Sequence, residues 1–232
     1  MKLSLIIPCY NESPNLPLLL ERCGQLAAQP GVEVVLVDNG STDNSPRVLQ
    51  ELLPKYPGCR SVRVDVNQGY GFGILSGLRT AEGEYLGWTH ADMQTDPMDA
   101  LRAMELLARH GRPAYAKGRR YGRPLADVFF TMGMSAFETV LLGKALWDIN
   151  AQPNIFPRTF FQTWENPPHD FSLDLYAYFM AKQSGLDVLR FPVRFGERAH
   201  GTSHWNVNWA AKRKFIRRTI DFSLQLRKSL KS

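Results

Sequence analysis

The sequence predicts an α/β fold: a single αβα sandwich around a mostly parallel sheet. Short runs of aliphatic and β-branched residues alternate with longer stretches whose apolar residues recur at helical spacing. The 232 residues suit one α/β domain of ordinary size, and no internal repeat or low-complexity linker divides them. Strands that alternate with helices are joined by right-handed crossovers, so we expect most neighbouring strands to be parallel.

The predicted strands are short apolar runs. Residues 3–8 and 32–38 are almost continuously aliphatic or β-branched, which is typical of strands that helices cover on both faces. Residues 59–66 instead alternate between apolar and polar side chains. The predicted strands are therefore 3–8, 32–38, 59–66, 85–89, 114–118 and 187–195.

Amphipathic stretches between these runs predict the helices. Leu16, Leu19 and Cys23 recur at helical spacing, and the preceding Ser13-Pro14 is typical of a helix start. The predicted helices are 16–27, 70–81, 128–146, 171–185 and 209–230, two more begin at Ser45-Pro46 and Pro97, and 148–158 is predicted to be a loop.

The composition excludes several classes of protein. Hydrophobic residues make up 44% of the chain and charged residues 22%, so disordered, collagen-like and coiled-coil proteins are excluded. We find no run of about 18 or more apolar residues and therefore expect no membrane span. The apolar run at the N-terminus is too short for a signal peptide. Three cysteines without metal-like spacing favour a reducing, cytoplasmic location.

The net charge is +6, from 28 Lys+Arg against 22 Asp+Glu. Such a surplus suits a nucleic acid, an anionic membrane surface or an acidic substrate. The first is disfavoured because the chain carries no recognised nucleic-acid-binding motif, and because its basic residues lie apart from the polar clusters described next.

Polar clusters follow three of the predicted strands. The first cluster runs from Pro8 to Glu12, the second begins at Asp38, and the third runs from His90 to Gln94. Ligands of open α/β sheets bind beyond the carboxyl ends of the strands, where these clusters should meet. The sequence therefore predicts one binding site on this rim.

The clusters resemble the family-2 glycosyltransferases, in segments 5–12, 35–43, 67–71 and 91–94. The resemblance implies the GT-A fold, a nucleotide-sugar donor and a divalent metal. Because the pattern of the sequence changes near Tyr121, we expect residues 1–120 to form the donor-binding half, 121–206 the acceptor side and 207–232 a basic C-terminal helix. The donor-side residues that the resemblance implies are Asp38 for the base, Pro8, Tyr10 and Glu12 for the nucleoside pocket, and Gly69, Asp92 and Gln94.

The metal is expected to be Mg²⁺ or Mn²⁺, which neutralises the departing diphosphate. Such cations prefer oxygen ligands, and Asp92 and Gln94 offer a carboxylate and an amide carbonyl two residues apart. His90 stands where the family usually has a first Asp, and Asn39 replaces another common Asp. His90 is a metal ligand, a hydrogen-bond partner of the diphosphate, or only a pocket wall. Asp92 has one alternative role, as a helix cap, for which Asp96 is better placed.

The second half resembles the polyprenol-phosphate sugar transferases of the dolichol-phosphate mannose synthase type. Residues 118–121, Ser135 and 194–203 carry this resemblance. It implies that Arg120 and Arg198 gather the phosphates of donor and acceptor, and a guanidinium fork suits phosphate oxygens. A surface ion pair is the alternative role for each arginine. Ser203 is expected to donate to a phosphate from a loop that closes over the donor.

An acidic residue near the acceptor has two possible roles. Asp148 is the best general base if the acceptor is a sugar hydroxyl, whereas a lipid phosphate needs no strong base and Asp148 would then only orient it. Capping the loop is its alternative role. Asp170 and Asp174 compete with it, although they suit a helix N-cap and a first turn. Residues 152–154 are expected to offer hydrogen bonds to sugar hydroxyls.

The last helix combines apolar residues with many lysines and arginines. Such a helix suits the interface of an anionic membrane, while a packed helix with a solvated basic face is the alternative.

These features together predict an inverting, metal-dependent transferase that moves a hexose from a donor of the GDP-mannose or UDP-glucose type to a polyprenyl phosphate. Inversion is implied only by the resemblance. The alternatives are a transferase acting on glycan hydroxyls, and a nucleotide-sugar-binding protein without activity. The expected location is the cytoplasm, or the inner face of the cytoplasmic membrane.

Overall fold

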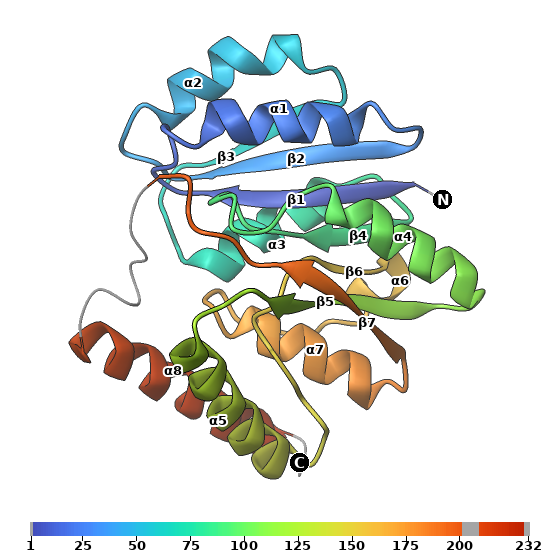
Figure 1. The fold of residues 1–232 in the computed structure, drawn as a ribbon, viewed down its shortest axis with the longest axis vertical. Coiled ribbons are helices and arrows are strands. Elements are labelled where there is room, and N and C mark those ends of the chain that lie inside the picture. Colours follow the sequence, from blue (N-terminus) through green and yellow to red (C-terminus); the bar gives the residue numbers. More distant parts are fainter. Residues whose placement is uncertain (1, 201–208, 230–232) are drawn as a thin grey trace.

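The computed structural model describes residues 2–200 and 209–229. Their strands form one seven-stranded sheet in the order β3-β2-β1-β4-β6-β5-β7 (Figure 1). The strands are β1 Leu3–Cys9, β2 Val32–Asn39, β3 Cys59–Val64, β4 Tyr85–Trp88, β5 Ala114–Tyr121, β6 Asn154–Pro157 and β7 Asp187–Arg194. The helices are α1 Leu16–Ala27, α2 Ser45–Leu52, α3 Tyr70–Thr80, α4 Asp99–His110, α5 Leu125–Leu142, α6 Arg158–Phe161, α7 Leu173–Gln183 and α8 Trp209–Ser229, with a 3₁₀ turn at Leu53–Lys55.

The sheet is mostly parallel, which confirms the predicted fold class. β1 pairs in parallel with β2 and β4, β2 with β3, and β5 with β7. Only β6 runs antiparallel, between β4 and β5. Helices α1, α2 and α4 pack on one face through residues such as Leu20, Leu49 and Leu107. Helices α3 and α7 pack on the other face through residues such as Leu75 and Phe179.

Two sequence predictions in the second half were wrong. The segment 148–158 is not all loop, because it contains β6 and the start of α6. All four residues of β6 are buried, so the strand shows no alternation, and its prolines resemble those of a loop. The long apolar helix also lies earlier than 128–146, at Leu125–Leu142. It ends because Gly143 adopts a positive φ of 67° and its N–H caps Thr139 O at 2.9 Å.

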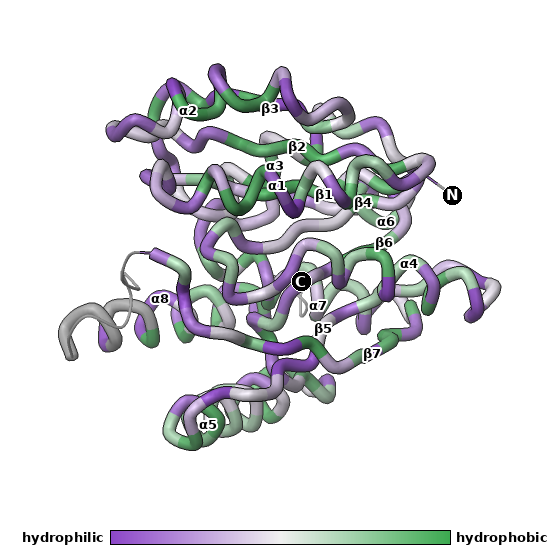
Figure 2. Tube along the Cα trace, turned by 45° about the horizontal axis from the view of Figure 1, so that its top comes forward, coloured by the Kyte–Doolittle hydropathy of each residue, from purple (hydrophilic) through white to green (hydrophobic). Residues whose placement is uncertain are grey.

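Helix α5 is inverted, with apolar side chains outside and polar side chains inside. Leu125, Phe129 and Val140 are 74%, 67% and 83% exposed, while Ser135 and Glu138 are buried. Among the described residues, α5 is long and apolar enough to cross a membrane by length and composition, with 17% of it buried. Length and composition alone do not make α5 a membrane span, so the expectation that the chain has none stays a prediction. α5 packs against α8, below the sheet in Figure 1, and Figure 2 shows it at the edge of the molecule.

Glu138 on α5 is buried against α8. Its Oε1 accepts a hydrogen bond of 2.8 Å from Ser223 Oγ, and Oε2 has no partner among the described residues. Burial raises the pKa of Glu138 from 4.5 to about 7. The folded state binds the Glu138 proton more tightly than the unfolded state does. The contribution of the neutral carboxyl group to the stability of the fold is therefore fully present below pH 4.5 and is lost as the pH rises through about 7.

We therefore expect Glu138→Gln to stabilise the protein at alkaline pH. At pH 8 the free energy of unfolding should rise by on the order of 2 kcal/mol, because glutamine carries no charge to bury. At pH 5 the difference should largely vanish. Urea unfolding at both pH values measures this, with the exposed Glu105→Gln on α4 as the control. Equal effects at the two pH values would contradict the assignment.

Candidate active site

The carboxyl ends of β1, β2 and β4 meet on one rim, as predicted, and the loops after β1 and β2 interlock there. Asn11 N donates to Ser41 Oγ at 3.1 Å, and Thr42 N donates to Asn11 Oδ1 at 2.8 Å. Glu12 N donates to Ser45 Oγ at 2.9 Å. Asn11 adopts a positive φ of 56°, which asparagine tolerates better than most residues. The two loops thus form one shared wall.

Asp38 lies at the base of this wall and is 3% exposed. Its Oδ1 accepts from Ser41 N at 3.0 Å, and its Oδ2 pairs with Arg63 Nη1 at 2.9 Å. The adjacent Gly40 has φ 71°, and a Cβ there would meet Asn67 N at 2.5 Å, so the bend behind Asp38 requires glycine. Both carboxylate oxygens are therefore fixed in place. The contact of Asp38 with a base stays a prediction.

The other residues predicted for the nucleoside pocket surround the same loops. Tyr10 is 39% exposed, and Pro8 and Glu12 are half-buried. Glu12 Oε2 accepts from Asn15 Nδ2 at 2.5 Å. Their contact with a nucleoside stays a prediction. Packing also requires glycine at position 69, because a Cβ there would lie 2.4 Å from His169 O.

Asp92 follows β4 and is 6% exposed. Its Oδ1 accepts from Gln94 N at 3.1 Å, and its Oδ2 pairs with Arg198 Nη2 at 2.8 Å. Gln94 N–H therefore orders the carboxylate, and Gln94 Nε2 donates to Gly196 O at 3.2 Å. That bond leaves Gln94 Oε1 as the atom able to meet a cation.

These two residues fit a hard divalent cation. Within residues 2–200 and 209–229, no group of three or more His, Cys, Asp or Glu is placed to hold a metal. Mg²⁺ and Mn²⁺ sites at phosphates need only one or two protein ligands, because substrate oxygens and water complete the shell. Asp92 and Gln94 can therefore hold such a cation together with a diphosphate.

His90 is half-buried, and its ring stacks on Tyr70 with centroids 5.7 Å apart. Burial lowers its pKa, so the imidazole is neutral near pH 7. A neutral ring suits metal ligation, a hydrogen bond to the diphosphate, or a pocket wall. Its role as a ligand stays a prediction.

The loop after β7 crosses the rim. Gly196 N donates to Gln94 O at 2.8 Å, and Asn15 Nδ2 donates to His200 O at 3.4 Å. Between these contacts Arg198 pairs with Asp92, and its side chain is 26% exposed. Arg198 therefore does form an ion pair, as the alternative role predicted, but with the largely buried Asp92 on the rim. Its contact with phosphates stays a prediction. Ser203 lies outside the described residues.

Because Arg198 occupies the same carboxylate oxygen that a cation would use, we expect Arg198→Ala to strengthen binding of Mn²⁺ to the free protein. The dissociation constant should fall about fivefold, the effect of removing a partly exposed ion pair. Transfer should fall at the same time, since the donor phosphates lose a guanidinium. Calorimetric titration with MnCl₂ measures the first effect, with the exposed Arg194→Ala as the control. Weaker Mn²⁺ binding in Arg198→Ala would contradict this competition.

Arg120 and Asp148 form a buried lock on the acceptor side. Arg120 Nε donates to Asp148 Oδ1 at 2.9 Å, Nη2 donates to the same oxygen at 2.5 Å, and the backbone N donates to Oδ2 at 2.9 Å. The side chains are 12% and 1% exposed. The Arg120 guanidinium also lies over the Phe195 ring at 5.2 Å, which joins the lock to the loop that carries Arg198.

Arg123 is a site residue that the sequence reasoning missed. Its Nη2 is 3.6 Å from Asp148 Oδ1, its Nη1 donates to Thr131 Oγ1 at 2.9 Å, and its side chain is 7% exposed. Its Nε has no partner among the described residues. Two arginines thus face one carboxylate, which leaves net positive charge. Its only sequence signal is its closeness to Arg119 and Arg120.

The structure overturns one further prediction and supports the structural roles predicted for two acidic residues. Gln152 and Asn154 are fully buried and hydrogen-bonded internally, so they do not offer bonds to sugar hydroxyls. Asp174 lies in the first turn of α7, and its Oδ1 accepts hydrogen bonds from Trp88, Gln152 and Asn154 in the interior, so it does not take the place of Asp148. Asp170 Oδ1 accepts from Ser172 N at 2.9 Å, so it caps the turn before α7.

The basic helix α8 fits the second predicted alternative, a packed helix with a solvated basic face. Leu226 is buried and Phe222 is partly buried against the core, while Arg213, Arg217 and Arg218 are exposed. Its C-terminal half is therefore a packed helix with a solvated basic face. The membrane contact that the sequence suggested for it stays a prediction.

Residues 4–171 match the model of glycosyl transferase family 2. The chain belongs to this family. Among its relatives are the undecaprenyl-phosphate 4-deoxy-4-formamido-L-arabinose transferases of Sodalis glossinidius, 28% identical over 89% of this chain and 63% of that protein, and of Proteus mirabilis, 36% identical over 62% and 44%. This family-2 chain thus spans about 63% of the length of the first of these relatives.

Solved structures share its fold. Glucosyl-3-phosphoglycerate synthase from Mycobacterium tuberculosis, with Mn²⁺, UDP and glucosyl-3-phosphoglycerate, superposes with a TM-score of 0.74 at 18% identity over 97% of this chain and 79% of that one. The same enzyme with Mn²⁺, UDP-glucose and glycerol 3-phosphate gives 0.75 at 18% identity over 97% and 79%. At this identity the likeness shows the fold alone, which is the predicted GT-A type.

Proposed function

We propose that the protein transfers a sugar from a nucleotide diphosphate to a polyprenyl phosphate, in a metal-dependent and inverting reaction. The observation that carries the proposal is the position of the Arg120–Asp148 lock. It lies between the rim that holds Asp38 and Asp92 and the outward-apolar helix α5. The names of the relatives support an undecaprenyl-phosphate acceptor, and the ligands of the structural neighbours support Mn²⁺ and a uridine diphosphate sugar.

The donor would bind along the rim. Asp38 and the shared loop wall would hold the nucleoside, and Asp92 with Gln94 would hold the cation. The cation supplies Lewis-acid neutralisation of the leaving diphosphate. Arg198, displaced from Asp92, would then face the diphosphate and stabilise its developing charge.

The state of Asp148 favours a phosphate acceptor over a sugar hydroxyl. Burial alone would raise its pKa, but the charge and hydrogen bonds of Arg120, with the charge of Arg123, outweigh burial and hold the pKa below its ordinary value. Both oxygens are already engaged by Arg120. Such a carboxylate is a weak general base, whereas an anionic phosphate needs none. Asp148 would therefore orient the arginines that receive the acceptor.

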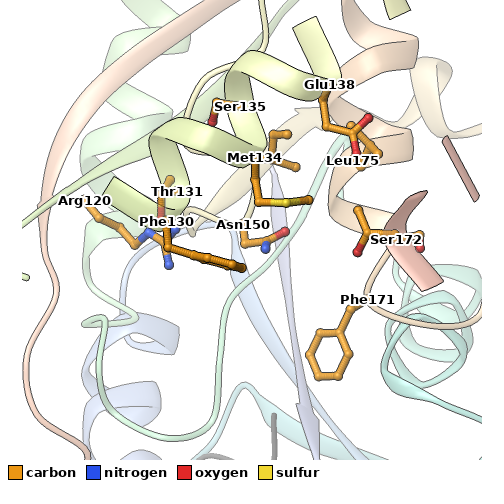
Figure 3. A pocket seen from close by; sticks show the side chains of 12 residues that line it. Arg120, Phe130, Thr131, Met134, Ser135, Glu138, Asn150, Phe171, Ser172 and Leu175 are labelled. Atoms are coloured by element: carbon orange, nitrogen blue, oxygen red, sulfur yellow. The ribbon is translucent and has the colours of Figure 1, made fainter. Parts of the chain in front are cut away.

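A pocket beside Arg120 supports a lipid acceptor. Arg120 lies at one end of a cavity of about 40 Å³, which continues along α5 past Phe130 and Met134 toward Leu175 (Figure 3). A cavity of this volume has room for roughly two or three water molecules, and not for a lipid chain. It marks where the first carbons beyond a phosphate held by Arg120 would meet apolar side chains.

A peripheral membrane contact would complete this arrangement. The exposed apolar residues of α5 and the exposed arginines of α8 lie on helices that pack against each other. A bilayer that touched both helices would gain apolar insertion from α5 and positive charge from α8. Such a surface suits an anionic bilayer, from which a polyprenyl phosphate would be drawn.

We expect Phe129→Asp with Val140→Asp to weaken binding to vesicles of phosphatidylglycerol by about tenfold, because two charges would replace inserted side chains. Sedimentation with vesicles measures this. Leu18→Asp, an exposed leucine on α1, is the matched control. Undiminished sedimentation of the double variant would refute contact through α5.

The function is tested with purified protein, Mn²⁺ and undecaprenyl phosphate in detergent. Labelled UDP-glucose, GDP-mannose and a nucleotide-linked 4-deoxy-4-formamido-L-arabinose serve as donors in parallel. Label entering the organic phase supports the proposal. Transfer only to added glycans would establish the hydroxyl-directed alternative, and donor binding without turnover under every donor and metal would establish an inactive binding protein.

A further inference from the structure

A buried polar network lies beneath the turn that carries Asp148. Its centre is Lys117 on β5, which is fully buried. Lys117 Nζ donates to Ala151 O at 2.8 Å and to Asn154 Oδ1 at 2.7 Å, and it lies 5.4 Å from the centre of the Tyr178 ring. Nothing in the proposed reaction uses this amine directly.

The network extends through the core to the opposite helix. Asn154 Nδ2 donates to Gln152 Oε1 at 2.7 Å and to Asp174 Oδ1 at 3.2 Å. Asp174 Oδ1 also accepts from Gln152 Nε2 at 2.8 Å and from Trp88 Nε1 at 3.0 Å. The network therefore ties β4, β5, β6 and α7 to the segment between Asp148 and β6.

Lys117 reaches Asp148 through a single turn. Ala151 N donates to Asp148 O at 3.0 Å, while Ala151 O accepts from Lys117. Beside it, Gly118 N donates to Pro153 O at 3.1 Å. Asp148 has a positive φ of 48°, a conformation that persists only where surrounding contacts impose it. Arg120 and Ser135 hold Asp148 directly, and Lys117 holds the other end of the same turn at Ala151 O.

Stability does not account for a lysine at this position. Burying an ammonium group costs several kcal/mol, and apolar residues of similar volume often replace buried charged networks without loss of stability. The physical reason that remains for a buried lysine here is that its hydrogen bonds fix the geometry of the turn. We propose that Lys117 is a positioning residue, which holds the 148–151 turn and thereby the Asp148–Arg120 lock in the geometry that transfer requires. This inference rests on the proposed function.

The charge of Lys117 changes near neutral pH. Burial lowers its pKa from 10.5 to about 7. An ammonium group makes stronger hydrogen bonds than a neutral amine, so the turn is held most firmly below pH 7. The charged groups that face it come from α7, β7, the turn and β5, and they are Asp174, Arg190, Asp148 and Arg120.

The test compares Lys117→Met with Lys182→Met, a half-exposed lysine on α7. In Lys117→Met, kcat should fall between about 10-fold and 100-fold, because misplaced catalytic groups cost rates of this order. The KM for the donor should change less than about threefold, since Asp38 lies on β2 and Asp92 follows β4, away from the 148–151 turn. The fall of wild-type kcat between pH 6 and 8.5 should be absent in Lys117→Met.

A second readout needs no turnover. The Arg120 Nε–H signal in a ¹⁵N spectrum, assigned with Arg120→Lys, reports the lock directly. In the wild type it should shift with a midpoint near pH 7, and in Lys117→Met it should move or broaden and lose that titration. If Lys117→Met does not fold, the titration of the wild-type Arg120 signal alone still tests whether Lys117 holds the Asp148–Arg120 lock.

A wild-type Arg120 signal that is flat over this range, or a Lys117→Met variant with unchanged kcat and signal, would overturn the positioning role. Equal changes in kcat and donor KM would also overturn it. If the wild type transfers nothing to undecaprenyl phosphate, the proposed function fails, and the Arg120 signal still decides whether Lys117 holds the lock.

Discussion

Asp92→Asn should reduce kcat/KM for transfer at least about a thousandfold, because the proposed cation site would lose its carboxylate. Asparagine keeps the shape of the side chain, and its Oδ1 still accepts from Gln94 N. Only the charge is removed. Mn²⁺ binding should weaken with the rate, and Arg198 should lose its partner.

Steady-state kinetics and a Mn²⁺ titration measure the two effects of Asp92→Asn. The matched control is Asp96→Asn, in the same loop, whose carboxylate pairs with Arg22 on α1 and caps the turn before α4. That variant should stay within about twofold of the wild type, as surface substitutions usually do. If Asp92→Asn keeps its Mn²⁺ affinity, the metal site lies elsewhere.

Arg120→Lys should lower kcat/KM for the acceptor by about two to three orders of magnitude while donor affinity stays close to normal. Lysine keeps the charge but replaces a planar fork by a single point charge. It cannot reproduce the two guanidinium bonds to Asp148 Oδ1, and it loses the contact with the Phe195 ring. Asp148 and Arg123 would then no longer hold a defined site for a phosphate.

Varying donor and acceptor separately distinguishes the two phosphates. The control is Arg119→Lys, an exposed arginine one residue earlier on β5. A rise in the donor KM with an unchanged acceptor KM would place Arg120 on the donor diphosphate instead. An unchanged rate in Arg120→Lys would remove the lock from the mechanism altogether.

The candidate site could be predicted on its donor side because the relevant signals are local. β1 and β2 are buried on both faces, so each is a continuous apolar run in the sequence. The polar residues that follow them, such as Asp38, must then lie at the strand ends, and parallel pairing brings those ends to one rim. Asp92 follows from the same reasoning, applied to β4.

The acceptor side depends on contacts that leave no local pattern. β6 has four buried residues, too few to show a period, and it enters the sheet antiparallel to its neighbours. The inverted helix α5 has the composition of an ordinary buried helix, and only its place outside the sheet exposes its apolar face.

By itself the sequence determined the order of strands and helices in the first half, the mostly parallel sheet and the rim with Asp38 and Asp92. These features can be predicted because burial and periodicity produce patterns among residues that are close in the sequence. Only the tertiary structure decided that Arg120 locks onto Asp148, that Arg123 joins them, and that Lys117 supports the turn beneath. These partners lie between 25 and 34 residues apart, so their pairing depends on how the chain folds back through β6.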